Sequence, residues 1–281
     1  MMKKIRLKDF SIGGDEPFVL IAGPCVIENE ESTLSAAEFL KDLTGTLGIP
    51  FIFKSSFDKA NRTSKDSYRG PGLEEGLRIL NRVKREMSVP VLSDVHRFEE
   101  IEAACDVLDV VQVPAFLCRQ TDFVMEVARR AAIVNIKKGQ FLAPWDISQV
   151  IEKVFAAGNK RVMVTERGVS FGYNTLVADM RSIPLMRGFG SPVVFDATHS
   201  VQSPGGAGTC SGGDREMAFH LARAAAAVGV DGIFMEVHER PDKALCDGPN
   251  SIAMAELPDI LKILKEIDET VKRIHYEREK E

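Results

Sequence analysis

Eight short apolar segments, each followed by a longer amphipathic stretch, are the feature of this sequence that most limits its possible folds. The segments are rich in Val, Ile and Phe and nearly continuous in apolar character, which is typical of parallel strands covered on both faces. They span residues 18–23, 50–56, 89–95, 110–115, 133–138, 161–168, 192–199 and 232–238. This alternation predicts an α/β fold built on a parallel sheet.

The stretches between these segments have the periodicity of amphipathic helices. The clearest helical patterns cover residues 30–48, 73–87, 123–132, 148–158, 215–229 and 257–277. Gly48, Gly158 and Gly229 end three of them, where a left-handed residue commonly closes a helix. Eight strand-then-helix units in 281 residues predict one (β/α)8 barrel domain covering residues 1–281.

The competing architecture is an open, doubly wound sheet. Such a sheet usually has a glycine-rich dinucleotide-binding turn after its first strand, and residues 23–28 (GPCVIE) do not form that motif. The barrel is therefore favoured. Residues 5–21 are predicted to include a small β-hairpin that turns at Gly13 and Gly14 and closes the bottom of the barrel.

Composition limits the partners and the compartment. Lys and Arg number 36 against 41 Asp and Glu, and this net charge of −5 argues against a protein that mainly binds nucleic acid or an anionic membrane. No stretch is apolar over the roughly 18 residues that a bilayer span needs, and no apolar segment of a signal peptide follows the basic start. The five cysteines form no CxxC pair, so we expect reduced thiols and a cytoplasmic location.

Polar and charged side chains recur at the carboxyl ends of the expected strands, where barrels of this kind place their chemistry. Such side chains are poor choices for strands buried on both faces, so their repeated position indicates a polar site. They are Cys25, Lys54, Ser56, Asp94, Gln112, Lys137, Lys138, Arg167, Asp196, His199, Glu236 and His238.

A long charged loop, residues 54–72, follows the second expected strand. Its cationic residues are Lys54, Lys59, Arg62, Lys65 and Arg69. Lys and Arg interleaved with hydroxyl groups suit a phosphate monoester, although a solvated basic loop has the same composition. Lys137 and Arg167 add cations on two other strands, so the site is expected to bind two anions or one ligand with two anionic ends.

Cys25, His199, Glu236 and Asp247 form a candidate metal site. Their spacing matches no compact metal motif, and the argument is topological, because the first, seventh and eighth strands become neighbours when a barrel closes. A thiolate, an imidazole and two carboxylates suit one divalent ion such as Fe²⁺, Mn²⁺ or Zn²⁺. The glycine-rich segment 203–213 is either a mobile lid or a flexible connection.

Several long segments, in order along the chain, resemble the family of 3-deoxy-D-manno-octulosonate 8-phosphate (KDO-8-phosphate) synthases. They are IAGPCVIE, FKSSFDKANRTS, LSDVH, VQVPAFLCRQTD, IKKGQF, TERGVSFGYNTLVADMR, FDATHSVQ and FMEVHERPDKALCDGP. The resemblance implies a (β/α)8 enzyme that condenses phosphoenolpyruvate with arabinose 5-phosphate and releases phosphate. Its product is the precursor of the KDO sugar of lipopolysaccharide.

The resemblance also implies roles for individual residues. Phosphoenolpyruvate is expected to contact Lys54, Ser56, Gln112, Ala115, Lys137 and Arg167. Arabinose 5-phosphate is expected to contact Asn61, Arg62, Ser64 and Asp94, with Arg119 reaching it from a neighbouring subunit of a homotetramer. The residues implied to be catalytic are Cys25, Lys59, Lys137, His199 and Asp247.

The family divides into metal-requiring members with Cys in the GPC position and metal-free members with Asn there. Cys25 resembles the first group, whereas the CDGP run around Asp247 also resembles the second. Two alternatives stay open at this point. One is a related synthase that uses erythrose 4-phosphate, whose sugar-phosphate loop more typically reads KPRT than KANRTS; the other is a catalytically silent barrel that only binds sugar phosphates.

Overall fold

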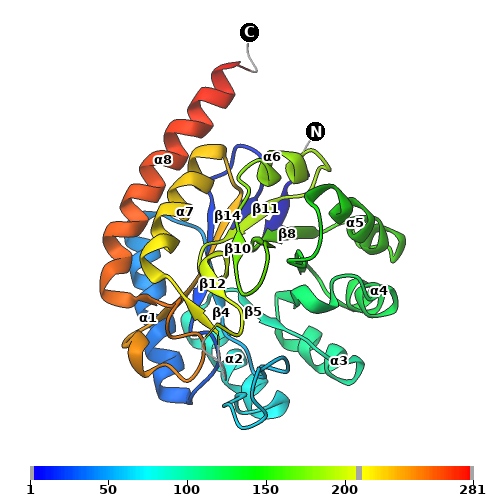
Figure 1. Cartoon of the computed structure of the whole chain (residues 1–281), viewed down its shortest axis with the longest axis vertical. Helices are drawn as coiled ribbons and strands as arrows, with labels where there is room; N and C mark the ends of the chain where they lie inside the picture. Colours follow the sequence, from blue (N-terminus) through cyan, green and yellow to red (C-terminus); the bar gives the residue numbers. More distant parts are fainter. Residues whose placement is uncertain (1–2, 207–210, 279–281) are drawn as a thin grey trace.

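The computed structural model describes residues 3–206 and 211–278, and within them eight parallel strands form a closed barrel (Figure 1). The strands are β3 (Val19–Gly23), β4 (Phe51–Lys54), β5 (Val91–Asp94), β6 (Val110–Val113), β7 (Val134–Lys137), β8 (Val162–Glu166), β11 (Val193–Asp196) and β14 (Gly232–His238). Each pairs with the next in sequence, and β14 also pairs with β3. This closure confirms the (β/α)8 barrel and excludes the open sheet, which needs two edge strands.

Helices surround the strands (Figure 1). They are α1 (Glu30–Leu47), α2 (Leu73–Met87), α3 (Phe98–Val107), α4 (Thr121–Arg130), α5 (Ile147–Ala156), α6 (Ser182–Arg187), α7 (Arg215–Val228) and α8 (Leu257–Arg278). All six helices expected from periodicity are present, and α3 and α6 are added to them. None of the described helices is long and apolar enough to cross a membrane.

The expected glycine stops are confirmed at all three positions. Gly48 and Gly229 are the left-handed C-caps of α1 and α7, with φ of 66° and 94°. Gly158, with φ of 92°, follows the C-cap of α5. Each helix therefore ends where a residue without a Cβ can turn the chain toward the next strand.

The N-terminal hairpin is present, but its expected turn is wrong. Strands β1 (Ile5–Leu7) and β2 (Phe10–Ile12) pair antiparallel and leave Lys8 and Asp9 as the turn. Lys8 takes the left-handed conformation, with φ of 49°. Gly13 and Gly14 also have positive φ, but they lie after β2, where the chain leaves the hairpin for the barrel.

The barrel interior is an apolar core that the hairpin covers. Ile5, Leu7 and Ile12 of the hairpin pack into one buried cluster with a side chain from each barrel strand or the residue just before it. Those partners are Val19, Ile21, Ile52, Leu92, Val110, Ile133, Met163, Val194 and Phe234. Because the interior is filled from this end, a ligand site is left to the other end of the barrel.

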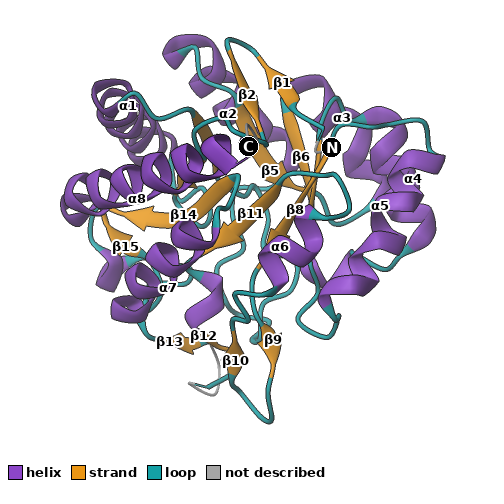
Figure 2. Cartoon of the chain, turned by 90° about the horizontal axis from the view of Figure 1, so that it is seen from above, coloured by secondary structure: helices purple, strands orange, loops and turns teal. Residues whose placement is uncertain are grey.

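Small elements gather at that other end. The pairs β9 (Val169–Ser170) with β10 (Leu176–Val177), and β12 (Gln202–Ser203) with β13 (Gly212–Gly213), lie opposite β1 and β2 in Figure 2. Strand β15 (Ile252–Ala253) extends the sheet beside β14. Short 3₁₀ helices cover 115–117, 144–146, 199–201, 241–243 and 254–256.

Candidate active site

A pocket opens at the carboxyl ends of the barrel strands and the loops that follow them. Six of the twelve residues expected at the strand ends line it, so the pocket lies at the end of the barrel where the site is predicted. The lining residues are Lys54, Lys59, Asn61, Arg62, Thr63, Asp94, His96, Gln112, Pro114, Ala115, Phe116, Lys137, Gln140, Arg167, His199, Gln202, Pro204, Gly205, Ser211, Cys246 and Asp247.

The floor of the pocket carries buried cations. Lys54 Nζ donates to the Cys25 carbonyl at 3.0 Å and to Glu236 Oε1 at 3.2 Å. Lys137 Nζ donates to Asp196 Oδ2 at 2.5 Å, and it lies 4.2 Å from the centre of the Phe234 ring. Burial lowers the pKa of Lys137, because a charged ammonium is poorly solvated there. An anionic ligand would add negative charge beside these lysines and favour their charged forms.

Arg167 is the clearest candidate for binding that anion. Its Nη2 donates to Gln202 Oε1 at 3.0 Å. Its Nη1 is buried and has no hydrogen-bond partner among the described residues. Burial also lowers the pKa of this guanidinium. A buried donor without an acceptor is costly, and a carboxylate or phosphate in the pocket would satisfy it with a charge-assisted bond.

His199 is oriented by Asp196, three residues earlier. Its Nδ1 lies 2.8 Å from Asp196 Oδ2, and Lys137 Nζ lies 3.3 Å from the same ring nitrogen. Nε2 thereby faces two carboxylates, at 3.6 Å from both Glu236 Oε1 and Asp247 Oδ2. Burial disfavours the imidazolium, but the charge of Asp196 outweighs it and raises the pKa of His199. A carboxylate that holds one ring nitrogen so that the other can bind a metal is a common arrangement.

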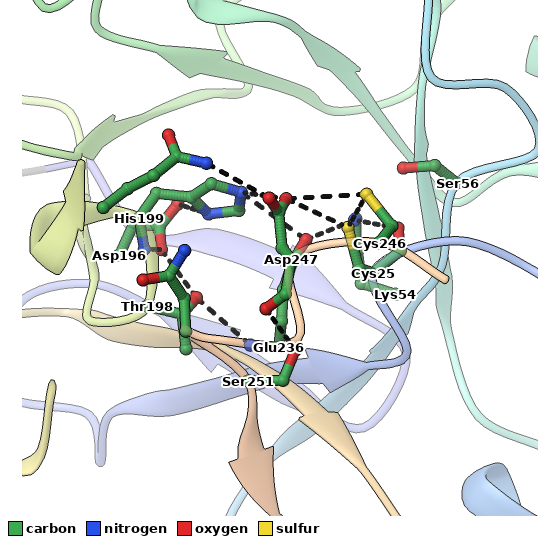
Figure 3. A network of polar contacts seen from close by, with 12 residues as sticks. Cys25, Lys54, Ser56, Asp196, Thr198, His199, Glu236, Cys246, Asp247 and Ser251 are labelled. Atoms are coloured by element: carbon green, nitrogen blue, oxygen red, sulfur yellow. Dashed lines mark hydrogen bonds and ion pairs between the residues drawn. The ribbon is translucent and has the colours of Figure 1, made fainter. Parts of the chain in front are cut away.

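Three of the four predicted metal ligands, His199, Glu236 and Asp247, have donor atoms within 4.8 Å of one another. The fourth, Cys25, has its Sγ 3.2 Å from Asp247 Oδ2, so Asp247 links the thiol to the other ligands (Figure 3). Glu236 Oε2 is buried and accepts no hydrogen bond within the part of the chain that the structure describes. A convergent donor set with an unsatisfied carboxylate oxygen fits a divalent ion of the kind predicted.

Asp247 is held in its charged form. Burial opposes this, but the hydrogen bond and charge of His199 lower the pKa of Asp247 well below its usual range. For Cys25 the balance is reversed, because burial and the nearby Cys246 raise the pKa of the thiol well above its usual value. A metal ion would have to displace the Cys25 proton, since the thiolate is the ligand form.

Asp94 forms a second carboxylate network on the other side of the pocket. It accepts a short hydrogen bond from the Ser56 hydroxyl and lies 3.0 Å from His96 Nε2. Glu100 Oε2 lies 3.7 Å from His96 Nδ1. Burial lowers the pKa of His96, but the two carboxylates outweigh it and raise this pKa to about 9. His96 is therefore a cation at neutral pH and keeps Asp94 oriented.

In the long charged loop, residues 54–72, some side chains line the pocket and others pair with each other inside the loop. Asn61 and Arg62 line the pocket, and Arg62 Nη1 donates to Cys246 Sγ at 2.7 Å. Arg69 is instead paired with Asp58, through contacts of 2.8 and 2.6 Å. One of its expected cations is thus neutralised within the loop.

Several predicted substrate residues do not reach the pocket wall. Ser56 is buried behind Asp94, and Ser64 Oγ accepts from the Asp66 backbone within its own loop. Arg119 is exposed and lies in a separate surface depression with Phe98 and Leu117.

The residues beside Arg119 differ in exposure. Cys118 is buried in this chain's own core among apolar neighbours. Phe116 stays exposed. In the glycine-rich segment 203–213, Pro204, Gly205 and Ser211 line the pocket, whereas residues 207–210 lie outside the described residues.

Three residues that line the pocket, His96, Gln202 and Cys246, are not part of the predicted site. Asp196 is expected at a strand end but has no predicted role, and the structure pairs it with Lys137. His96 and Asp196 carry a sequence signal, because each lies two or three residues from an assigned polar residue at a strand end. Cys246 adjoins Asp247, and only the folded chain shows that it also meets Cys25.

Comparison with known proteins agrees with this geometry. Residues 2–273 match the DAHP synthetase I family. The chain is 60% identical over 272 residues to a Geobacter metallireducens protein named 2-dehydro-3-deoxyphosphooctonate aldolase, covering 97% of this chain and 100% of the relative. A protein of the same name from Geotalea uraniireducens is 61% identical with the same coverage. One from Desulfosudis oleivorans is 62% identical, over 94% of this chain and 95% of its own.

The fold, the strand-end pocket and these matches lead to one assignment. This chain belongs to the DAHP synthetase I family.

Proposed function

We propose that this chain condenses phosphoenolpyruvate with D-arabinose 5-phosphate and water to give 3-deoxy-D-manno-octulosonate 8-phosphate and inorganic phosphate, as a transferase of KDO biosynthesis. The observation that carries the proposal is the pocket that joins the buried Arg167 and Lys137 to the cationic loop at Arg62. Two anionic substrates that repel each other need two cationic regions facing one cavity. The names of the relatives support the same substrate class.

In the proposed reaction, carbon 3 of phosphoenolpyruvate forms a bond to the aldehyde carbon of the sugar. Water adds at carbon 2, and the C–O bond to phosphate then breaks. We propose that Lys137, Arg167 and the backbone at Ala115 bind phosphoenolpyruvate, with Lys54, Ser56 and Gln112 supporting its position. Lys59, 3.7 Å from Glu236, would lie between the two substrates.

The sugar phosphate is assigned to the outer part of the pocket. Asn61 and Arg62 line it there, and Asp94 is available to the sugar hydroxyls. Ser64 is included in this proposal, although its hydroxyl accepts a hydrogen bond from the Asp66 backbone within the loop. The KANRTS loop, which places Asn61 on the wall, favours arabinose 5-phosphate over the shorter erythrose 4-phosphate.

We further propose that the enzyme is of the metal-requiring type, with Cys25, His199, Glu236 and Asp247 holding one Fe, Mn or Zn ion. When bound, the ion would supply Lewis-acid chemistry that orients the aldehyde, activates water, or both. Asp196 keeps His199 Nε2 turned toward the two carboxylates. Lys54 and Lys59 offset the negative charge of Glu236.

Three broader proposals accompany this function. The chain forms one domain over residues 1–281 and acts in the cytoplasm. It assembles as a homotetramer in which Arg119 completes the sugar-phosphate site of a neighbour. The exposed position of Arg119, away from its own pocket, supports the last of these.

The test is to supply the purified protein with phosphoenolpyruvate and either arabinose 5-phosphate or erythrose 4-phosphate, and to measure phosphate release. We expect release with arabinose 5-phosphate. Preference for erythrose 4-phosphate would show that the chain is instead the related synthase that uses this sugar. If phosphoenolpyruvate is not consumed with either sugar, the chain is a catalytically silent barrel that only binds sugar phosphates. Dialysis against a strong chelator is expected to remove most activity, and Mn²⁺ or Fe²⁺ to restore it. Full activity of protein shown by elemental analysis to be metal-free would overturn the metal-requiring type.

A further inference from the structure

Cys246 lies inside the candidate metal site although it belongs to neither the predicted ligand set nor the proposed mechanism. Its Sγ is 3.0 Å from Cys25 Sγ and 3.6 Å from Asp247 Oδ2. The two cysteines are free thiols, and their separation exceeds the roughly 2.05 Å of a disulfide bond. Cys25, Cys246 and Asp247 thus form a second group of donor atoms within 4.8 Å of one another, joined to the first through Asp247.

We propose that Cys246 is a second thiolate ligand of the divalent ion, so that the site is a two-sulfur centre selective for Zn²⁺ over Mn²⁺. This inference rests on the proposed metal site and extends it by one donor. Figure 3 shows both sulfurs on the same side of Asp247, with His199 on the other. An ion beside Asp247 Oδ2 would therefore meet sulfur on one side and nitrogen and oxygen on the other.

The donor distances suit a shared ion. Zinc binds sulfur at about 2.3 Å and carboxylate oxygen at about 2.0–2.2 Å, so adjacent donors on one ion lie at least about 3 Å apart. Cys25 Sγ and Cys246 Sγ lie 3.2 and 3.6 Å from Asp247 Oδ2. A small separation of the two sulfurs from their 3.0 Å contact is the change that binding would require.

The surrounding charges can support a second thiolate. Arg62 Nη1 donates to Cys246 Sγ at 2.7 Å, so the sulfur already acts as an acceptor. Lys54 and Lys59 lie 3.2 and 3.7 Å from Glu236 Oε1. These three cations and the divalent ion together offset two thiolates and two carboxylates, which would otherwise repel one another in a buried site.

The second sulfur would change which ions the site prefers. Thiolates are soft ligands that favour Zn²⁺ and Co²⁺, whereas Mn²⁺ prefers oxygen. A site with one thiolate among nitrogen and oxygen donors discriminates less between them. Cys246 would therefore act as a determinant of metal identity rather than of substrate binding.

The experiment counts thiolates directly in the full-length protein. Metal-free protein, kept reduced, is titrated with Co²⁺, and the near-ultraviolet sulfur-to-cobalt absorption band is measured at saturation. We expect Cys246→Ser and Cys25→Ser each to lose about half the band of the unmodified protein. The double variant should lose nearly all of it. Cys105→Ser, which removes a half-buried cysteine of α3, is the matched control and should keep the full band.

The outcomes separate this inference from the proposed metal site. A full band in Cys246→Ser, with cobalt bound, would overturn the second thiolate and leave the original ligand set intact. No band and no bound cobalt in the unmodified protein would overturn both. X-ray absorption of the zinc-loaded unmodified protein gives a count that needs no variant, with two sulfur neighbours expected and one contradicting the inference. Competition should also show Cys246→Ser losing at least about tenfold in its preference for Zn²⁺ over Mn²⁺.

Discussion

Single residues at the pocket floor act through partners on other strands. Lys137 at the end of β7 meets Asp196 at the end of β11, and Lys54 at the end of β4 meets Glu236 on β14. Burying either charge alone would be strongly unfavourable, whereas a buried pair is tolerated. These pairs hold cationic groups at fixed positions before any substrate arrives, which is how a site lowers the cost of binding an anion.

Arg167→Ala should weaken phosphoenolpyruvate use, because it removes a buried guanidinium whose Nη1 is left for a ligand. A charge-assisted contact to a desolvated anion is worth about 1.5–3 kcal/mol, or roughly 10- to 100-fold in kcat/KM. Steady-state kinetics with phosphoenolpyruvate varied is the measurement. Arg181→Ala, which removes an exposed arginine paired with Asp179, is the control. Unchanged kinetics in Arg167→Ala would mean that the pocket floor is wrongly assigned.

His96→Gln should make stability less dependent on pH. The folded-state pKa of His96, about 9, lies above its unfolded value of about 6.5. The stabilising contribution of its charge is therefore complete below pH 6.5 and is lost as pH rises through 9. At 1.36 kcal/mol per pKa unit, this contribution is about 3 kcal/mol.

Urea unfolding of the unmodified protein and of His96→Gln at pH 6 and pH 9.5 tests this prediction. The unmodified protein should have the higher free energy of unfolding at pH 6, and this difference should disappear at pH 9.5. His220→Gln, which changes an exposed histidine of α7, serves as a control for substitution itself. Parallel stability curves for His96→Gln and the unmodified protein would show that Asp94 and Glu100 do not hold a charged imidazole.

The charged residues of the site are more predictable from the sequence than their contacts are. Lys137, Arg167 and His199 are predicted from strand ends, because barrel geometry brings all such ends to one rim. The sulfur contact between Cys25 and Cys246 is not predictable, since it joins residues 221 positions apart through a loop of irregular shape. The pairing of Arg69 with Asp58 escapes prediction for a similar reason, because composition does not show which charges of a loop neutralise each other.

At the scale of elements, the hairpin formed by β1 and β2 has a structural role separate from the pocket. Ile5, Leu7 and Ile12 enter the apolar interior of the barrel. The intervening residues Arg6 and Ser11 pair with each other across the two strands. One face of the hairpin therefore closes the end of the barrel opposite the pocket.

Ile12→Ala should cost about 2–4 kcal/mol of unfolding free energy, because it leaves a cavity in a fully buried cluster. The kcat of the folded variant should stay unchanged, since the hairpin lies at the end opposite the pocket. Denaturant unfolding and kinetics on the same preparation test both parts. Ser11→Ala on the same strand should change neither. A large loss of kcat in folded Ile12→Ala would show that the hairpin also shapes the pocket.

The strands are predictable because short, continuous apolar runs separated by amphipathic stretches are typical of a parallel sheet buried on both faces. The short helix α6 is harder to predict, since its six residues span less than two turns and leave little periodicity to detect. The predicted hairpin turn is misplaced because Gly13 and Gly14 are stronger turn signals than Lys8 and Asp9. Lys8 adopts the left-handed conformation that glycine more readily supplies, and packing of the flanking apolar residues determines the register.

At the scale of the whole molecule, the proposed tetramer makes a prediction that one chain alone cannot satisfy. Arg119→Ala should raise KM for arabinose 5-phosphate far more than for phosphoenolpyruvate, because Arg119 lies outside its own pocket. Arg62→Ala should impair the same substrate from within the pocket. After subunit exchange at equal amounts, about a quarter of the shared sites would contain both arginines again.

Recovery of activity on mixing is the measurement, with each variant exchanged against itself as the control. Light scattering on the same samples gives the oligomeric state. A monomer that is fully active at assay concentration would contradict the shared site. Failure of the mixed sample to gain activity despite proven exchange would assign Arg119 to a role within its own subunit.

The closed end of the barrel, opposite the pocket, also bears on the order in which substrates bind. Within the described residues, the hairpin and the apolar interior fill the barrel at the end opposite the pocket. Under the proposed function, substrates and products would therefore enter and leave on the pocket side. Both Lys137 and Asn61 line the pocket, but Lys137 is almost fully buried whereas Asn61 is exposed. Under the proposed assignment, a sugar phosphate at Asn61 would cover a phosphoenolpyruvate bound at the more buried Lys137. We therefore expect phosphoenolpyruvate to bind first and to be retained while the sugar phosphate is bound.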